Sequence, residues 1–375
     1  MPCIAVIWWL VAGNGHTPEG WFAAKTTPAD IAAAWVALAA TEPAAINVSA
    51  LPPDAGLPLS PTRPDPTSLS ALAAPAVIPG GWRLSSYSGL SYGAISEHAA
   101  SDHDARIGTA TTAGAAPPDI APEDILRFPR GGPAGECVHV VFEEADFTDS
   151  STWDRAIALA LDNHPQALPG VPQKEGRERL RAMLWQMLVD VTSAEISEGL
   201  RLDSVTRQRR LNELEFNFPV PHLSATGLNE LLSQLGYGGP RLTFSRLEGY
   251  LKGFIDLIFE HQGRFYILDW KSNHLGFATA DYDGGPVATA MAEHGYHLQY
   301  LLYAVALDRY LQRRIPGYRY ETHFGGVLYL FVRGVRPAWR NSDGTAAGVY
   351  AHVPPHEAIL QLNEIFGHLS AEVVP

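Results

Sequence analysis

The stretch GFIDLIFEHQGRFYILDWKSN, residues 253–273, decides the fold because it reads as two hydrophobic strands joined by the tight turn EHQGR. A strand packed between helices should be apolar throughout, since an unpaired buried carboxylate costs several kcal/mol. Yet Asp256 lies near the middle of the first strand, Asp269 near the end of the second, and Lys271 just after it. These three charges therefore need partners inside the fold.

A divalent cation is the simplest partner for two aspartates that converge from adjacent strands. Hard oxygen ligands suit Mg²⁺, and the ion offsets the repulsion between like charges. Because Lys271 follows Asp269 by two residues, the alternation of a strand places both side chains on one face. An Asp-x-Lys pair beside a metal can position a water and stabilise charge developing on phosphorus, as phosphodiester hydrolysis requires.

Two neighbouring segments add candidate residues. The predicted strand NELEFNFPV (212–220) carries Glu213 and Glu215 on one face, and either could supply a third carboxylate. The predicted helix HGYHLQYLLYAVALDRYLQRR (294–314) carries Gln299 and Tyr303 at positions i and i+4, which could both reach a phosphate backbone. Packing alone also explains each feature, because a lone D-x-K is common and aromatic helix faces usually fill cores.

The C-terminal two thirds have the pattern of a packed α/β domain. An amphipathic helix is predicted within 177–196, followed by strands at 212–220, 250–260 and 264–272, the helix at 294–314, and a strand at 323–334. The apolar face of the first helix is formed by Leu180, Met183, Leu184, Met187, Leu188 and Val191. This order predicts a mixed central sheet flanked by helices.

The N-terminal part has a different composition. Residues 1–51 form a small α/β fragment, with a buried strand over Ile4–Ala12 and a helix over 27–40, and residues 52–122 read as a Pro/Ala/Ser-rich linker before a domain at 123–375. The apolar run is about half the length of a membrane helix and has no basic residue before it. We therefore expect no membrane contact. Cys3 and Cys137 permit at most one disulfide, which favours a reducing cytoplasm.

The net charge of -13 limits how the chain could bind nucleic acid. Such acidity argues against a broad electrostatic field that holds DNA unaided. Any contact with DNA should be local, bridged by metal ions, or supplied mostly by another subunit.

The stretch extended to GFIDLIFEHQGRFYILDWKSNHLG resembles the nuclease domain of the RecB family, the beta subunits of exodeoxyribonuclease V, within the PD-(D/E)XK nuclease superfamily. The similarity runs from about Asp124 to Gly334, through DILRFPRGGPAGECVHVVFEEADFTDSSTW, HGYHLQYLLYAVALDRYL and YRYETHFGGVLYLFVRG. It implies a restriction-endonuclease-like core and a requirement for Mg²⁺, with Mn²⁺ able to substitute.

The resemblance assigns roles to individual residues. Asp256 and Asp269 match the metal-binding aspartates, Lys271 the catalytic lysine, and Glu213 the upstream acidic residue, with Glu215 as the other claimant. Further matches are His139 in GECVHVVFE as an imidazole at the metal, Gln299 and Tyr303 as the QxxxY motif that helps place DNA, and Asn273 as a group supporting the site.

The departures from the family are equally informative. RecB proteins resemble helicases for most of their length, but no G-x-x-x-x-G-K-[ST] phosphate loop occurs here, so the sequence predicts no ATP site and no motor. Residues 1–51 resemble the last piece of the helicase region. The chain is interpreted as a helicase remnant, a linker and a nuclease.

The leading hypothesis is a Mg²⁺-dependent DNA exonuclease and endonuclease of double-strand break repair and recombination. Single-stranded DNA delivered by a motor, and RecC-like and RecD-like subunits, are the expected partners in an intact complex. One alternative is a catalytically idle docking module that contacts partner subunits; another is an unrelated hydrolase of small phosphoesters. The presence of Asp256, Asp269 and Lys271 together favours the nuclease.

Overall fold

The computed structural model describes residues 28–41, 47–49, 82–92, 117, 119–244 and 246–367. The chain divides into two compact units, Met1–Ala76 and Val77–Pro375. In the first unit the helix α3 (Pro28–Thr41) matches the helix predicted there, whereas the strand predicted over Ile4–Ala12 lies outside the described residues. Of the helices described, none combines the length and the apolar character needed to cross a bilayer.

The second unit is built on a mixed sheet of six strands. β4 and β6 pair antiparallel with β5, β7 pairs parallel with β6, and β8 pairs antiparallel with β7. The strands are β1 (Trp82–Ser85), β4 (Arg210–Leu223), β5 (Leu247–His261), β6 (Arg264–Lys271), β7 (Phe324–Phe331) and β8 (Val349–His352). The predicted mixed sheet is therefore confirmed.

The hairpin between β5 and β6 closes through a two-residue turn. His261 pairs with Arg264, and the residues between them, Gln262 and Gly263, have φ of 51° and 78°. Positive φ at both central residues is the type I′ geometry, whose twist matches that of the flanking strands. The turn predicted at EHQGR is confirmed, and it fixes the register of the two aspartate-bearing strands.

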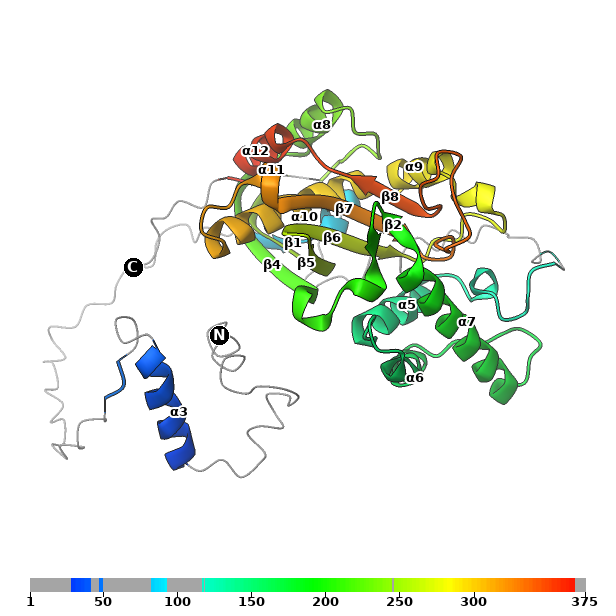
Figure 1. Ribbon diagram of the computed structural model, residues 1–375. Helices are drawn as coiled ribbons and strands as arrows, with labels where there is room; N and C mark the ends of the chain where they lie inside the picture. Colours follow the sequence, from blue (N-terminus) through cyan, green and yellow to red (C-terminus); the bar gives the residue numbers. More distant parts are fainter. Residues whose placement is uncertain are drawn as a thin grey trace, which may run out of the picture. The chain divides into compact units, whose positions relative to one another are not determined.

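Helices cover both faces of the sheet and enclose two hydrophobic cores (Figure 1). The α10-side core lies under α4 (Tyr87–Tyr92), α8 (Ala225–Gln234), α9 (Gly284–Glu293), α10 (Tyr296–Arg314) and α12 (His356–Ile365). The α7-side core lies under α5 (Gly132–Glu144), α6 (Trp153–Asn163) and α7 (Gln173–Ser193), which Figure 1 shows grouped on one side of the sheet. The sheet is thus the middle of three layers.

Short elements complete the unit. They are β2 (Glu195–Ser197), β3 (Leu200–Arg201), α11 (Tyr320–His323) and the 3₁₀ turns η3 (Ile125–Arg127), η4 (Ser150–Thr152), η5 (Leu202–Ser204), η6 (Arg207–Arg209) and η7 (Thr279–Tyr282). β2 and β3 form a separate two-stranded sheet.

The amphipathic face predicted for α7 forms the centre of its core. All six predicted apolar residues, Leu180, Met183, Leu184, Met187, Leu188 and Val191, are buried there. Tertiary packing of such a face, more than intrinsic helix propensity, stabilises a helix in a protein.

The segment Trp82–Tyr92 departs from the expectation of a linker over 52–122. Trp82–Ser85 forms β1 and pairs parallel with Glu248–Leu251, while Tyr87 and Leu90 are buried in the α10-side core. The folded unit therefore recruits residues that precede the expected boundary at residue 123. Strands this short leave little periodicity in a sequence.

Candidate active site

Asp256 lies where β5 changes its pairing partner. β4 occupies one edge of β5, so the other edge is shared between β6, which pairs with Leu257–His261, and β1, which pairs with Glu248–Leu251. Asp256 lies at the fork between the segments of β5 that pair with β1 and with β6. Its carboxylate takes the place of a backbone carbonyl there, because Oδ2 accepts a hydrogen bond of 2.9 Å from the backbone N–H of Trp270. The Asp256 charge thus lies at a break in the backbone hydrogen bonding between strands.

The side-chain alternation of β5 also slips at this fork. Ile255 and Ile258, three residues apart, both enter the α10-side core, whereas Leu257 and Phe259 enter the α7-side core. A regular strand would place residues three apart on opposite faces. Since Ile255 and Leu257, two residues apart, enter opposite cores, the irregularity falls at Asp256.

Glu213 lies opposite Asp256 on β4. The flanking pairs are Asn212 with Leu257 and Leu214 with Ile255, and Glu213 itself has φ of 51°. A non-glycine residue held at positive φ costs of order 1–3 kcal/mol and is maintained only where its surroundings enforce it. Both strands are therefore distorted at the same level.

The structure separates the two candidate glutamates. Glu215 Oε1 lies 3.0 Å from Lys252 Nζ in an exposed ion pair. Glu213 instead groups with His139 and Asp256.

His139 reaches the fork from α5. Its Nδ1 lies 3.4 Å from Asp256 Oδ2, and the two side chains are only 13% and 12% exposed. Phe142, one turn further along α5, stacks on Trp270 with ring centroids 3.9 Å apart. Since residues three apart share a helix face, the packing of Phe142 directs His139 toward the end of β6.

His139, Glu213 and Asp256 fit a divalent cation. Each offers one ligand atom, and these atoms all lie within 4.8 Å of one another. Two carboxylate oxygens and one imidazole nitrogen suit a hard or borderline divalent ion, and three protein ligands leave positions for water and a phosphate oxygen. The sequence grouped His139 and Asp256 with Asp269 and offered Glu213 or Glu215 as a further carboxylate. The geometry places Glu213 with His139 and Asp256, and metal binding by Asp269 stays a prediction.

Asp269 and Lys271 form a buried ion pair beside this cluster. Lys271 Nζ lies 2.7 Å from Asp269 Oδ1, with the side chains 0% and 2% exposed. The ammonium group also lies 4.0 Å from the ring centroid of Tyr296 and 5.3 Å from that of Tyr329. Carboxylate and aromatic faces together compensate the lysine for lost hydration.

Tyr329 lies beside Asp269 on the neighbouring strand. It pairs with Asp269 across β6 and β7. Burial raises its pKa well above the ordinary value, and the charges of Asp269 and, more weakly, Asp256 act in the same direction. Its phenol therefore stays neutral and donates a hydrogen bond of 3.1 Å to Gln299 Oε1.

Gln299 and Tyr303 lie behind Tyr329. Gln299 Nε2 donates to the Tyr303 hydroxyl over 3.0 Å, and the two residues are 3% and 6% exposed. They share a face of α10, as their spacing predicted. In this arrangement they brace Tyr329 from inside the fold, and a direct contact with DNA stays a prediction.

Asn273 links β6 to the start of α10. Its Oδ1 accepts a hydrogen bond of 3.3 Å from the Tyr296 hydroxyl, and its Nδ2 lies 3.4 Å from His294 Nε2. Asn273 thereby fixes the ring on which Lys271 rests. Sequence reasoning missed Tyr296, although it precedes Gln299 by three residues and so lies on the same helix face.

Arg333, whose role was also not predicted from the sequence, connects the segment that precedes α5 to the end of β6. It donates to the carbonyls of Ile125, Phe128 and Pro129, and its Nε donates to that of Ser272, over 2.6–2.9 Å. Burial lowers its pKa to about 10, so it remains a cation at neutral pH. Arg333 therefore helps to fix the segment that leads into α5 against the end of β6.

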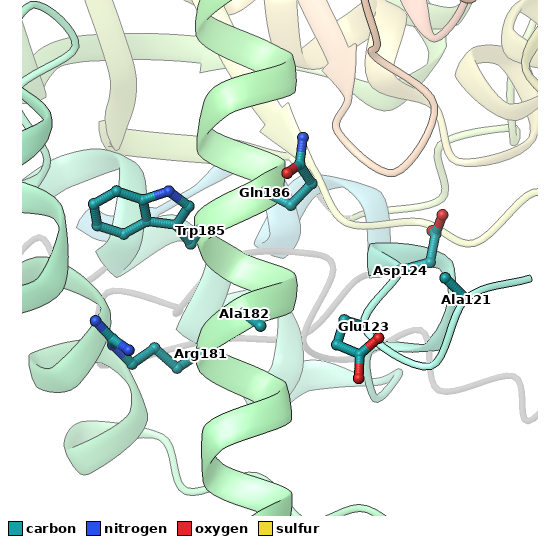
Figure 2. A pocket seen from close by; sticks show the side chains of 7 residues that line it. All are labelled: Ala121, Glu123, Asp124, Arg181, Ala182, Trp185 and Gln186. Carbon is teal, nitrogen blue, oxygen red and sulfur yellow. The ribbon is translucent and has the colours of Figure 1, made fainter.

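A cavity of about 550 Å³ opens beside α7, away from these residues (Figure 2). Its lining consists of Ala121, Glu123, Asp124, Arg181, Ala182, Trp185 and Gln186. Asp124 there is already bound to Arg336, with 2.6 Å between Oδ1 and Nη2. None of the cluster residues lines this cavity, so size alone does not locate the site.

Comparison with known proteins gives one family match and a set of curated relatives. Residues 124–371 match the PD-(D/E)XK nuclease superfamily. The chain is similar to RecBCD enzyme subunit RecB of Escherichia coli, 37% identical over 253 residues, which are 66% of this chain and 20% of that protein. The RecB subunit of Haemophilus influenzae is 32% identical over 245 residues, 65% of this chain and 19% of that protein.

A mycobacterial relative completes the comparison. The RecB subunit of Mycolicibacterium smegmatis is 34% identical over 268 residues, 64% of this chain and 24% of that protein. The chain thus spans about a fifth to a quarter of the length of these three curated relatives.

Proposed function

This chain belongs to the PD-(D/E)XK nuclease superfamily, and we propose that it is a deoxyribonuclease that hydrolyses DNA phosphodiester bonds with Mg²⁺, for which Mn²⁺ can substitute. One observation carries the proposal. The ligand atoms of His139, Glu213 and Asp256 lie within 4.8 Å of one another beside the buried pair of Asp269 and Lys271.

Each residue has a distinct proposed role. A divalent ion bound by His139, Glu213 and Asp256 would supply Lewis-acid polarisation of the scissile phosphate. Asp269 holds the Lys271 ammonium group in place, with 2.7 Å between Oδ1 and Nζ. Lys271 would orient the attacking water and stabilise negative charge as the phosphorus–oxygen bond to the leaving group breaks.

The reaction needs no reading of bases, because every proposed group acts on the phosphate backbone. We propose single-stranded DNA as the substrate form. The relatives are named as subunits of a RecBCD enzyme, so we propose RecC-like and RecD-like partners and a place in recombination and double-strand break repair in the cytoplasm. Because the sequence contains no G-x-x-x-x-G-K-[ST] loop, we expect no ATP site in it and propose that a motor subunit delivers the DNA.

Cleavage of linear single-stranded DNA tests the proposal against the docking alternative. The full chain should degrade DNA with Mg²⁺ and stop when a chelator is added, and Asp269→Ala should abolish activity. Asp154→Ala, an exposed carboxylate on α6 paired with Arg181, is the matched control and should cleave normally.

Two results would overturn the proposal. Cleavage that persists in chelator would exclude the metal mechanism. A well-folded wild-type chain that binds partner subunits but cleaves no DNA at any Mg²⁺ or Mn²⁺ concentration would support the docking module instead.

A further inference from the structure

A groove of about 250 Å³ runs between β4 and the second half of α10. Its lining residues are Leu214, Glu215, Phe216, Asn217, Phe218, Ala306, Arg309, Tyr310, Arg313 and Arg314. Three arginines and three aromatic rings thus face one hollow, in a chain whose net charge is -13.

Among the residues that the structure describes, the two exposed arginines of the groove are not neutralised by carboxylates, whereas Arg309 lies near the charge of Asp308. Within the described part of the chain, neither Arg313 nor Arg314 forms an ion pair, and both are exposed. Glu215, the carboxylate of the lining, is bound to Lys252 at 3.0 Å. The groove therefore keeps a net positive charge.

Arg309 is a fixed part of the wall. Its Nε donates to Asn363 Oδ1 over 2.5 Å, and its Nη2 donates to the Gly367 carbonyl over 2.8 Å. Burial lowers its pKa to about 10, and the nearby charge of Arg313 acts in the same direction. Two guanidinium groups thus lie close enough to repel each other, and a bound anion would relieve that repulsion.

The helix dipole offers a second reason for this charge. Arg313 and Arg314 lie in the last turn of α10, where cations stabilise the helix terminus whatever their function. The dipole does not account for their position over a groove that also contains Phe216 and Tyr310.

The lining of the groove includes the residue next to a member of the cluster of Glu213, Asp256 and His139. Leu214, a lining residue, directly follows Glu213 on β4. Phe216 packs edge-on against Tyr303, with ring centroids 5.8 Å apart. Along α10, residues 299, 303, 306, 310 and 313 are spaced by four and three, so one helix face runs from Gln299 to the groove.

Resting on the proposed function, we propose that this groove binds the phosphodiester backbone of the DNA strand that occupies the site. Arg313 and Arg314 contact phosphates, and Tyr310 provides an aromatic face against which a base stacks. A positive groove with interleaved aromatic side chains is the usual means of binding single strands without reading sequence. An acidic polypeptide would use the arginines but gain less from the aromatic faces.

Binding measured in chelator, without cleavage, tests the groove. Anisotropy of a fluorescent oligothymidylate is recorded with the full chain over a range of salt concentrations. Arg313→Ala/Arg314→Ala should weaken binding by about 10-fold or more and lower the slope of log affinity against log salt by roughly 0.7 for each phosphate that is no longer bound. Tyr310→Ala should weaken binding with no change in that slope.

The matched control removes two positive charges elsewhere. Arg177→Ala/Arg181→Ala changes exposed arginines of α7 that pair with Asp162 and Asp154, and it should bind as the wild type does. Equal weakening of DNA binding in both double variants would show that net charge alone explains the effect, and it would overturn the proposal that the groove binds DNA. Competition by polyglutamate as effective as that by unlabelled oligothymidylate would also overturn it.

The experiments distinguish failure of the groove proposal from failure of the nuclease proposal. If the wild-type chain cleaves DNA and the Arg313→Ala/Arg314→Ala variant has the same KM, only the groove proposal is contradicted. A chain that never cleaves but shows the predicted loss of affinity and salt slope contradicts the nuclease alone. With both correct, the double variant raises KM and leaves kcat nearly unchanged, because these arginines do not touch the reacting phosphate.

Discussion

Lys271 Nζ lies 2.7 Å from Asp269 Oδ1, and neither side chain is more than 2% exposed. The alternation of a strand predicts that residues two apart share a face, but not that they are buried this completely. Two charges withdrawn from water depend on each other, because each compensates for the hydration that its partner gave up. The contact that is proposed to hold Lys271 for catalysis therefore also contributes to stability.

Breaking this pair should destabilise the protein. Asp269→Ala should lower the free energy of unfolding by about 3–5 kcal/mol, since it leaves the Lys271 ammonium group buried without its carboxylate. Urea denaturation followed by circular dichroism measures the change. The double variant Asp269→Leu/Lys271→Met should lose less than the sum of the two single changes, and strict additivity would show that the pair is not coupled.

The two neighbouring glutamates of β4 should differ in metal binding. Glu213→Gln should weaken Mn²⁺ binding by at least about 10-fold, the lower end of what the loss of a supporting group around a metal costs. Glu215→Gln makes the same chemical change two residues away, where the carboxylate binds Lys252, and should leave the affinity unchanged. Isothermal titration with Mn²⁺ compares them, and equal losses would contradict the three-residue site.

Tyr329→Phe tests the bracing role of Gln299. The change removes the hydroxyl that donates to Gln299 Oε1 over 3.1 Å and should cost about 1–3 kcal/mol of unfolding free energy. Tyr310→Phe removes a hydroxyl from a half-buried ring on the same helix as Gln299, and should change stability by less than about 0.5 kcal/mol. Equal effects in thermal or urea unfolding would argue that the Gln299 contacts do not stabilise the fold.

His274 should make stability fall in mild acid. Its Nε2 lies 2.8 Å from Arg130 Nη2, and burial, followed by the charges of Arg130 and Arg333, lowers its pKa from 6.5 to about 4. A lowered pKa means that the unfolded state takes up the proton first. The stabilising contribution is therefore complete above pH 6.5 and is lost as the pH falls toward 4.

A pH series of urea unfolding curves checks this window. His274→Asn should show a flatter dependence between pH 6.5 and 4, because the titrating group is gone. An unchanged slope in the variant would assign the acid sensitivity to other groups.

The sequence predicted those elements whose burial follows a regular period. α7, α10 and the hairpin of β5 and β6 were predictable because their apolar residues repeat over many positions and because EHQGR suits a tight turn. β1 and β8 have only four residues each, too few for a period to be recognised. Their positions depend on partners distant in the chain.

The residues of the candidate site were likewise predictable only where regular spacing determines their placement. Spacing alone indicated that Asp269 and Lys271 share a face. It left Glu213 and Glu215 equivalent, because the φ of 51° that sets Glu213 apart arises from the distortion of two paired strands. The burial of Gln299 was equally invisible, since its partner Tyr329 comes from a strand that follows in the chain.

The pairing of β1 with β5 has a practical consequence for anyone preparing this protein. A fragment trimmed to the family match at 124–371 would lack Trp82–Tyr92. Glu248–Leu251 would then keep β4 on one edge but lose β1 on the other, and Tyr87 and Leu90 would be missing from the interior. An uncovered strand edge beside exposed apolar surface is a template for aggregation. Boundaries drawn from similarity alone would cut through the folded body, and expression should begin upstream of residue 82.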